Sequence, residues 1–383
     1  MIKKSKLTGI ILFLSSCISV YEPVGLEDMS GILVVDGMIL DTGTTIQLSR
    51  TVILKKTAFS TKFDNVNNAT IHVIDEENNV VAFAEQQYID GKINPGVYAV
   101  NHTISFAPGM KYALDIRLEG KHYRSAFVSP VHTPEIEEVS WQLNDDKSID
   151  IFVSTHDPTN QINHFRWAFH EAWEIRSKIF WTYRFDPDTR TVVEQSFSGD
   201  NRWYCWASDY SKSLLLASSA KYNAAVIKNH KIHGFRPGTS RYSYLYSILV
   251  KQYGLDNEAY LYFENLQRNM DESGSLFAPQ PSEIIGNMQC ISNPEETVIG
   301  YIFASTVATY RLYIPMAQQY LNDFEDQMDC FLDVRLNPPR NPEQAYQWGL
   351  GMMQGGYVFI DCVDCTFRGG TKTKPDYWPN DHQ

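Results

Sequence analysis

The pattern of apolar and polar residues in the first third of the chain is typical of short β-strands. From Ile32 onwards, apolar runs recur at regular intervals between turn-like polar residues; they cover residues 32–37, 45–49, 69–74, 96–100 and 111–118. In the last run Tyr112, Leu114 and Ile116 alternate, so they share one face of a half-buried strand. About seven short strands within about a hundred residues predict an immunoglobulin-like β-sandwich over residues 31–132, although the Cys…Trp…Cys core of antibody domains is absent.

The rest of the chain, residues 133–383, is expected to form a larger β-rich domain with helical insertions. Pro130 and Pro134 mark the boundary, and a new run of strands begins at residues 149–153. A later strand is predicted where apolar residues alternate at Tyr242, Tyr244, Tyr246, Ile248 and Val250.

Two helices are expected among these strands. Asp256 can cap a helix that stops before Gly274 and whose apolar side consists of Ala259, Tyr262, Phe263, Leu266 and Met270. A second helix is expected within residues 314–324, and residues 338–356 are expected to form a long loop.

The first seventeen residues have the features of a lipoprotein signal peptide. Three lysines precede an apolar run at residues 7–14, and Ser15 and Ser16 lead to Cys17. The apolar run is far shorter than the roughly twenty residues that span a bilayer. We therefore expect residues 1–16 to be removed, Cys17 to carry acyl chains, and residues 17–30 to form a tether.

The sequence after Cys17 favours the outer membrane. Ile18 follows the cysteine, where an Asp would suggest retention in the inner membrane. Sparse acidic residues after the anchor, Glu22, Glu27 and Asp28, favour the cell surface over the periplasmic face.

The net charge excludes one class of partner. Removal of the leader takes three lysines and no acidic residue, which leaves 30 basic and 45 acidic residues, a formal net charge of −15. Binding of nucleic acid needs a basic surface, so we expect no nucleic-acid partner.

Five cysteines follow Cys17, and in an oxidising compartment we expect them to form structural disulfides that leave one thiol over. They are Cys205, Cys290, Cys330, Cys362 and Cys365. The CxxC formed by Cys362 and Cys365 lies among glycines, so we favour a structural role over a redox pair or half of a zinc site. Our expected pairings are Cys330 with Cys362 or Cys365, and Cys205 with Cys290.

The motifs of most common enzymes are missing, and we assign no catalytic, cofactor or metal-binding residue. The sequence contains no GxSxG, HExxH, P-loop or strand-linked GxGxxG. The pair His170-Glu171 lacks the second histidine of a metalloprotease helix. His230 and His233 have the spacing of two metal ligands, but the polar residues around them favour a solvated strand or turn. A hydrolase with an unrecognised pair of carboxylates stays a minor alternative.

Clusters of aromatic residues offer a second kind of candidate site. Trp203, Tyr204 and Trp206 could stack on a sugar or anchor a partner, although such rings more often fill a β-rich core. This cluster is the expected surface for a second hypothesis, an independent module on the cell surface that binds glycan or peptide.

Three separated motifs resemble a known family. They are GSLFAPQPSEIIGN from Gly274, NPEETVIGYIFAS from Asn293, and CVDCTFRGGTKTKPDYWPN from Cys362. Together with ILVVDGMILD in the first domain, they closely resemble the Bacteroidota lipoproteins catalogued as domain of unknown function 4249. The likeness covers essentially the whole mature chain.

The resemblance implies a location and a companion rather than a reaction. Members of the family look like outer-membrane lipoproteins whose genes often neighbour a TonB-dependent transporter, and the family has no established catalytic residues to carry over. We therefore expect a non-catalytic, lipid-anchored accessory of such a transporter, acting in nutrient capture or uptake.

Overall fold

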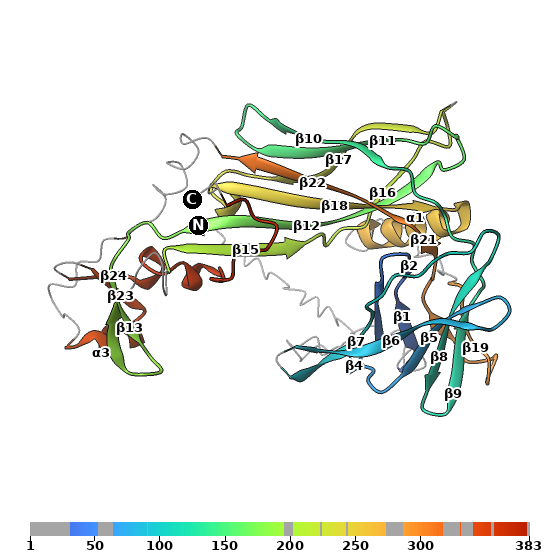
Figure 1. Ribbon diagram of the computed structural model, residues 1–383, viewed down its shortest axis with the longest axis horizontal. Helices are drawn as coiled ribbons and strands as arrows, with labels where there is room; N and C mark the ends of the chain where they lie inside the picture. Colours follow the sequence, from blue (N-terminus) through green and yellow to red (C-terminus); the bar gives the residue numbers. More distant parts are fainter. Residues whose placement is uncertain are drawn as a thin grey trace, which may run out of the picture.

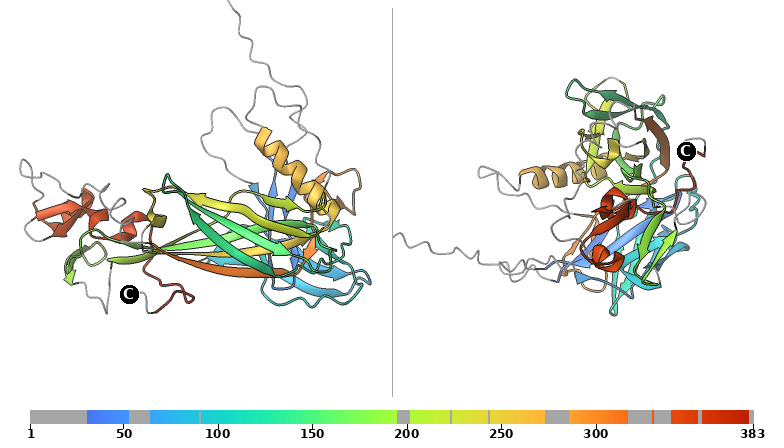
Figure 2. Two further views of the ribbon diagram at one scale, coloured as in Figure 1. Left: turned by 90° about the horizontal axis from the view of Figure 1, so that it is seen from above. Right: turned by 90° about the vertical axis from the view of Figure 1, so that its left-hand side faces the viewer.

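A computed structural model of the protein describes residues 31–52, 64–89, 91–194, 202–222, 224–242, 244–272, 286–316, 330, 340–353 and 356–380. The predicted leader, Cys17 and the tether lie outside these residues. The fold is mainly β, as predicted, and consists of two β-rich domains and a small C-terminal module (Figures 1 and 2). No helix in the described part of the chain is long and apolar enough to cross a bilayer.

The first domain is built around one continuous sheet of ten strands rather than two separate sheets. The order is β19-β9-β8-β5-β6-β7-β3-β1-β20, with β4 paired to β3. The long strand β6 joins the two halves, because it pairs with β5 near its start and with β7 near its end. The immunoglobulin-like arrangement is therefore not confirmed, although both halves bury their apolar residues in one core.

The five predicted runs correspond to β1, β3, β5, β7 and β8, and the other strands of this domain were not predicted. The bounds of the strands are β1 (Leu33–Asp36), β2 (Ile39–Leu40), β3 (Thr44–Arg50), β4 (Asp64–Asn65), β5 (Thr70–Asp75), β6 (Val80–Ile89), β7 (Lys92–Val100), β8 (Tyr112–Leu118), β9 (Lys121–Ser125), β19 (Met288–Cys290), β20 (Val298–Ile299) and β21 (Ala304–Ser305).

Residues 286–305 lie in the first domain, which differs from the expected division at residue 132. Strand β19 extends the sheet beside β9, whereas β20 and β21 pair in parallel with β1 and β2. Asn287 secures this return, because its side chain donates to the carbonyl of Ile302 (2.7 Å) and accepts from the Ile302 amide (2.8 Å). A domain boundary placed at one point of the sequence cannot include this later segment, because its strands pair with strands that lie far away in the chain.

Two glycines let the returning segment approach β1 closely. Gly300 has φ +148°, and a Cβ built there would lie 2.3 Å from the carbonyl oxygen of Val35. A Cβ on Gly286 would lie 2.0 Å from the carbonyl oxygen of Gly300. Both positions therefore need glycine, which gives a packing reason for the two motifs that contain them.

Replacing Gly300 by alanine should lower the free energy of unfolding by roughly 1–3 kcal/mol, because strain and a backbone collision coincide. Urea denaturation with tryptophan fluorescence measures the loss. Gly109→Ala is the matched control, since Gly109 has φ +74° but open space around its Cβ position, and about 1 kcal/mol is expected there. Equal losses in the two variants would show that the contact with Val35 contributes nothing.

The second domain consists of two facing sheets. A three-stranded sheet, β10-β11-β17, packs on a five-stranded sheet ordered β15-β12-β18-β22, in which β16 also pairs with β12 (Figure 1). The bounds are β10 (Ile136–Leu143), β11 (Ile149–His156), β12 (His164–Arg176), β15 (Tyr204–Tyr210), β16 (Leu215–Ser218), β17 (Val226–Phe235), β18 (Leu245–Leu255) and β22 (Val307–Pro315).

Helix α1 (Asn257–Glu272) confirms the predicted helix and its cap, because Asp256 accepts a hydrogen bond from the Ala259 amide at 2.7 Å. Ala259 and Phe263 are buried at the contact between the two domains. The helix expected at residues 314–324 is wrong at its start, because Ile314 lies in β22; residues 317–324 lie outside the described residues.

The C-terminal module lies at the opposite end of the long sheet from the first domain (Figure 1). It contains β13 (Tyr183–Asp186), β14 (Thr191–Glu194), α3 (Pro342–Gln347), β23 (Leu350–Met353) and β24 (Gly356–Phe359), with single 3-10 turns at η4 (Ile360–Cys362) and η5 (Cys365–Arg368). The expected long loop at residues 338–356 is therefore replaced by a helix and a hairpin.

Candidate ligand site between the two domains

A cleft of about 780 Å³ lies where the two domains meet. Its floor is the face of β12 and β18 that points away from the facing sheet, and one wall is α1. A second wall consists of residues 34–36 and 299–301 of the first domain, where Tyr301 stacks on Tyr262 of α1 with ring centroids 4.8 Å apart. Known ligand sites are typically clefts of roughly 300–1,000 Å³ at such domain boundaries. The dimensions and position therefore make this cleft the principal candidate site.

Alternation along β12 determines which side chains reach the cleft. The odd-numbered residues from Phe165 to Ile175 are buried in the core between the two sheets. The even-numbered residues Arg166, Ala168 and His170 line the cleft. On β12 the period of two therefore places one cation, Arg166, and one imidazole, His170, on the cleft side.

Arg166 is the principal charged group of the cleft floor. Its guanidinium lies over the Phe263 ring, 4.7 Å from the centroid, and 6.0 Å from that of Phe303. Within the described part of the chain, no acceptor lies within hydrogen-bonding distance of it and no carboxylate forms an ion pair with it. Burial lowers the pKa of Arg166, and nearby Asp36 acts in the opposite direction.

The remaining charged residues of the cleft are mostly basic. Lys212 and Lys251 line it, and Asp36 is its one carboxylate among the described residues. Lys212 is paired with Asp209 at 2.8 Å, so part of its charge is compensated. His170 stacks on Tyr210 with ring centroids 4.5 Å apart, and burial together with Arg311 and Lys251 lowers its pKa. The cleft thus combines aromatic and aliphatic walls with an excess of positive charge.

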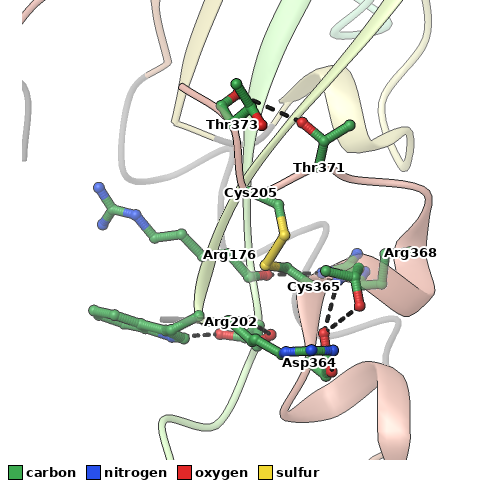
Figure 3. The surroundings of a disulfide bond; sticks show 11 residues. Arg176, Arg202, Cys205, Asp364, Cys365, Arg368, Thr371 and Thr373 are labelled. Carbon is green, nitrogen blue, oxygen red and sulfur yellow. Dashed lines mark hydrogen bonds and ion pairs between the residues drawn. A yellow bond between two sulfur atoms is a disulfide. The ribbon is translucent and has the colours of Figure 1, made fainter. Parts of the chain in front are cut away.

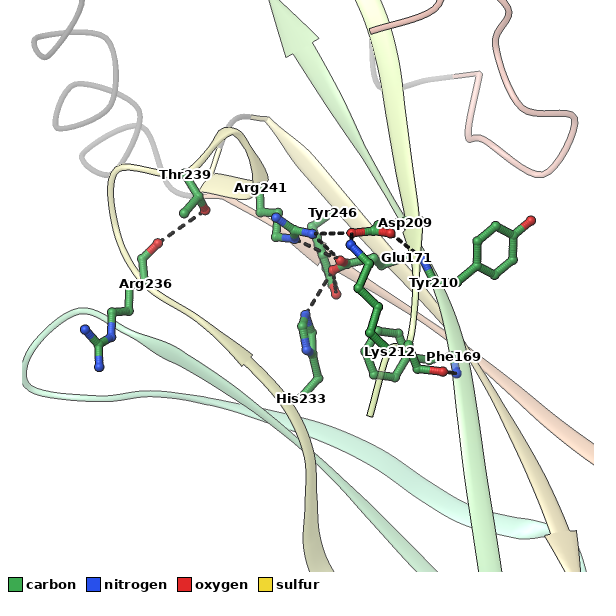
Figure 4. Close-up of polar contacts among 11 residues, drawn as sticks. Phe169, Glu171, Asp209, Tyr210, Lys212, His233, Arg236, Thr239, Arg241 and Tyr246 are labelled. Atoms are coloured by element: carbon green, nitrogen blue, oxygen red, sulfur yellow. Dashed lines mark hydrogen bonds and ion pairs between the residues drawn. The ribbon is translucent and has the colours of Figure 1, made fainter. Parts of the chain in front are cut away.

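A second polar group lies in the core behind the cleft, around the buried Glu171 (Figure 4). Arg241 Nε donates to Glu171 Oε1 (2.9 Å), the Tyr246 hydroxyl donates to Oε2 (2.7 Å), and His233 Nε2 lies 3.0 Å from Oε2. Arg241 also lies over the Trp173 ring, 4.3 Å from its centroid. Burial alone would raise the pKa of Glu171, but its bonds to His233 and Arg241 hold it at about 2. A carboxylate held charged by three partners is a structural anchor rather than a proton donor.

The histidine motifs of the sequence have structural roles in this arrangement. His170 and Glu171 are neighbours on a strand, so they point to opposite faces, His170 to the cleft and Glu171 to the core. His230 stacks on the buried Trp167 (5.1 Å between centroids), and burial lowers its pKa. The segment is a strand with Lys228, Asn229 and Lys231 exposed, as expected, but both histidine rings pack against β12. The described residues contain no group of three or more potential metal ligands.

The aromatic cluster Trp203, Tyr204 and Trp206 does not form an exposed platform. Trp206 is buried beside Trp378, and its backbone pairs with Thr371 of the C-terminal segment. The Trp203 indole donates to the Ser177 carbonyl at 2.7 Å. The Tyr204 ring lies 4.5 Å from the Arg176 guanidinium. These rings anchor the end of the chain to the sheet, so they do not support a stacking site for glycan or peptide.

Two disulfides connect the C-terminal segment to the rest of the protein. Cys205 pairs with Cys365, which joins β15 to η5 (Figure 3), and Cys330 pairs with Cys362. The second pairing is one of the two alternatives expected for Cys330. The expected pair of Cys205 with Cys290 is wrong: Cys290 is buried in the first domain and is the free thiol among the described cysteines. Both cysteines of the CxxC are disulfide-bonded to other cysteines, as a structural role requires.

Hydrogen bonds around the Cys205–Cys365 disulfide hold the segment in place. Arg202 binds the Asp364 carboxylate at 3.0 Å, and Arg368 donates to the Arg176 carbonyl at 2.9 Å (Figure 3). A Cβ on Gly370 would lie 2.5 Å from the Cβ of Cys205. The glycine is therefore required by packing against the disulfide.

A second cavity, of about 650 Å³, is the place where several carboxylates come together, as the hydrolase alternative requires. Glu135, Glu137, Asp157 and Asp256 line it. Asp256 caps α1, and Asp157 accepts from the backbone amides of the loop that follows it, including Ile162 at 2.8 Å. Burial would raise the pKa of Asp157, but these bonds lower it overall. A general acid needs a raised pKa, so Asp157 does not fit that role.

The period of two along β12 was the sequence signal that could have identified Arg166. The polar residues His164, Arg166 and His170 alternate with Phe165, Trp167 and Phe169. No sequence pattern identified the first-domain wall of the cleft, because that wall forms only when residues 286–305 pair with strands of the first domain.

The family described as Domain of unknown function (DUF4249) matches residues 21–311. The match covers more than half of the chain and includes both domains that form the cleft. No curated protein matches the sequence. The chain belongs to the DUF4249 family.

Proposed function

We propose that this member of the DUF4249 family is a non-catalytic, lipid-anchored accessory protein of the outer membrane. It acts with a TonB-dependent transporter in nutrient capture or uptake, and it faces the cell surface. The observation that carries the proposal is the combination of an amino-terminal lipoprotein signal with a cleft between two domains of suitable size for cargo. An anchored protein with such a cleft is suited to hold a small molecule near the mouth of a barrel.

The length of the proposed tether limits how far the first domain can lie from an anchored Cys17. Thirteen residues, 18–30, lie between Cys17 and Gly31, the start of the described chain. Even fully extended, they span at most about 50 Å. Two or three acyl chains on Cys17 hold a protein on a membrane durably.

The composition of the cleft supports a binding role rather than catalysis. Asp36 is its one carboxylate among the described residues, so that lining does not supply the two carboxylates that glycoside hydrolysis uses. Among the described residues, the carboxylate with a strongly shifted pKa is Glu171; its pKa is lowered, and its oxygens are bound by Arg241, Tyr246 and His233.

Purification from native outer membranes tests the association with a transporter. We expect the tagged, lipidated protein to bring a stoichiometric amount of a TonB-dependent barrel with it in mild detergent, as measured by mass spectrometry. The Cys17→Ala variant is the control; it should leave the membrane fraction and lose the barrel. A lipidated protein that is recovered alone, also after cross-linking, would refute the association.

A further inference from the structure

We propose that the cleft binds a small organic anion, with the charged group on Arg166 and an apolar, ring-containing body against the aromatic and aliphatic walls. This inference names the class of cargo and rests on the proposed function for the role of the bound molecule. The binding itself is a property of the cleft and is measured without a transporter.

The surroundings of Arg166 prepare it for an anion. The Phe263 ring lies against the guanidinium at 4.7 Å and the Phe303 ring lies on the same group at 6.0 Å. These ring contacts use no hydrogen bond of the guanidinium, so its in-plane N–H donors suit the two oxygens of a carboxylate, phosphate or sulfonate. No described residue accepts a hydrogen bond from these donors. Arg166 is partly buried, and because no described residue accepts from its guanidinium, the N–H donors are available to a ligand.

The charge of the cleft is opposite to that of the protein. The chain has a formal net charge of −12, yet the described residues that line the cleft include Arg166, Lys212 and Lys251 against the single carboxylate of Asp36. Local positive charge in a narrow, apolar site attracts anions more strongly than it would on an open surface.

The other lining residues indicate that the ligand is more than an inorganic ion. The cleft has a volume of about 780 Å³, and its walls include Tyr262, Phe263, Leu214 and Tyr301. A phosphate ion would leave most of this apolar surface in contact with water. A molecule with rings or an aliphatic chain would cover it, and aromatic walls favour rings in stacked or edge-on contact.

Two fluorescent probes distinguish the contribution of the ligand's charge to binding from that of its apolar body. 1-Anilinonaphthalene-8-sulfonate carries a sulfonate, and N-phenyl-1-naphthylamine is the same ring system without it. The protein is the whole mature chain with Cys17→Ala, which retains every described residue and needs no detergent. Fluorescence titration should show at least about ten-fold tighter binding of the sulfonate, since a charge-assisted hydrogen bond contributes that much.

Variants of the cleft identify the site. Arg166→Gln should weaken sulfonate binding about ten-fold or more and change binding of the neutral probe less than about two-fold. Arg117→Gln removes the same charge from an exposed position outside the cleft and should change neither affinity. Ala168→Trp fills the floor of the cleft and should weaken both probes. Arg166→Lys keeps the charge but loses the pair of parallel N–H donors of the guanidinium, so an intermediate affinity is expected. The melting temperature of each variant verifies that it is folded.

Three results would overturn the inference. They are equal affinity of the unsubstituted cleft for both probes, unchanged sulfonate binding in folded Arg166→Gln, and displacement of the sulfonate by millimolar inorganic phosphate, which would indicate a simple anion site. Failure of the proposed function leaves a different signature, because probe binding would persist while the barrel is absent from the purified membrane complex.

Discussion

Replacing Glu171 by glutamine should lower the free energy of unfolding by about 3–5 kcal/mol, the usual loss when one partner of a buried ion pair is removed. The glutamine has nearly the same shape, so the loss reports on charge and hydrogen bonds rather than on packing. Arg241 would lose its buried counter-charge while it stays held over Trp173, and the Tyr246 hydroxyl would lose a charged acceptor. Urea denaturation with tryptophan fluorescence measures the difference.

Asp209→Asn is the matched control for this variant. The Asp209 carboxylate lies 3.5 Å from Arg241 but is about one-third exposed and also binds Lys212. Exposed pairs contribute about 0–1 kcal/mol, so only a small loss is expected there. Similar losses in the two variants would contradict the view that Glu171 is the main counter-charge of Arg241.

The pH dependence gives a second check on Glu171. Its pKa is lowered from the ordinary glutamate value of 4.5 to about 2 in the folded protein, so ionisation of this group stabilises the fold by about 3 kcal/mol above pH 4.5. This contribution is lost as the pH falls from about 4.5 through 2, because the folded state must then take up the proton. The stability difference between the unsubstituted protein and Glu171→Gln should therefore shrink over this interval. A constant difference would mean that Glu171 does not have the low pKa.

The second large effect is expected from the disulfide between Cys205 and Cys365. Replacing both cysteines by serine should lower the free energy of unfolding by roughly 2–5 kcal/mol, because the bond closes a loop with a sequence separation of 160 residues. It also fastens the segment whose Trp378 covers Trp206. Equilibrium unfolding in urea gives the global loss, and limited proteolysis under native conditions reports release of the C-terminal segment.

The other disulfide is the internal comparison. Cys330 and Cys362 are 32 residues apart, so loop-closure entropy predicts that their bond contributes about 1.4 kcal/mol less. Replacing that pair by serine should leave Trp206 covered. A larger loss from this shorter loop would show that local contacts, rather than loop closure, dominate the stabilisation by disulfides here.

Much of the local structure could be predicted from the sequence, since it depends on neighbours along the chain. The strand at Tyr112, Leu114 and Ile116 and the capped helix after Asp256 were found at nearly their observed bounds. The helix expected after Ile314 was wrong at its start, because pairing with β18 holds that residue in a strand. Partners distant in sequence outweighed a local preference there.

The candidate site was less predictable for the same reason. The residue types around Trp206 are typical of a ligand surface, but the C-terminal segment covers Trp206. Only folding brings this segment next to β15. Cys205 was paired with the wrong cysteine because sequence distance carries no information on which thiols meet in space.

The sequence by itself determined the mainly β fold, the family and many of the local elements, because these depend on the period of side chains along each segment and on separate motifs. It also carries the lipoprotein signal from which an anchored location is proposed. Only the tertiary structure decided that residues 286–305 return to the first domain, that both disulfides fasten the C-terminal segment, and that Arg166 faces a cleft between two domains. Each of these depends on pairing between segments that lie far apart in the chain, where the gain from burying shared apolar surface, rather than any local preference, selects the partner.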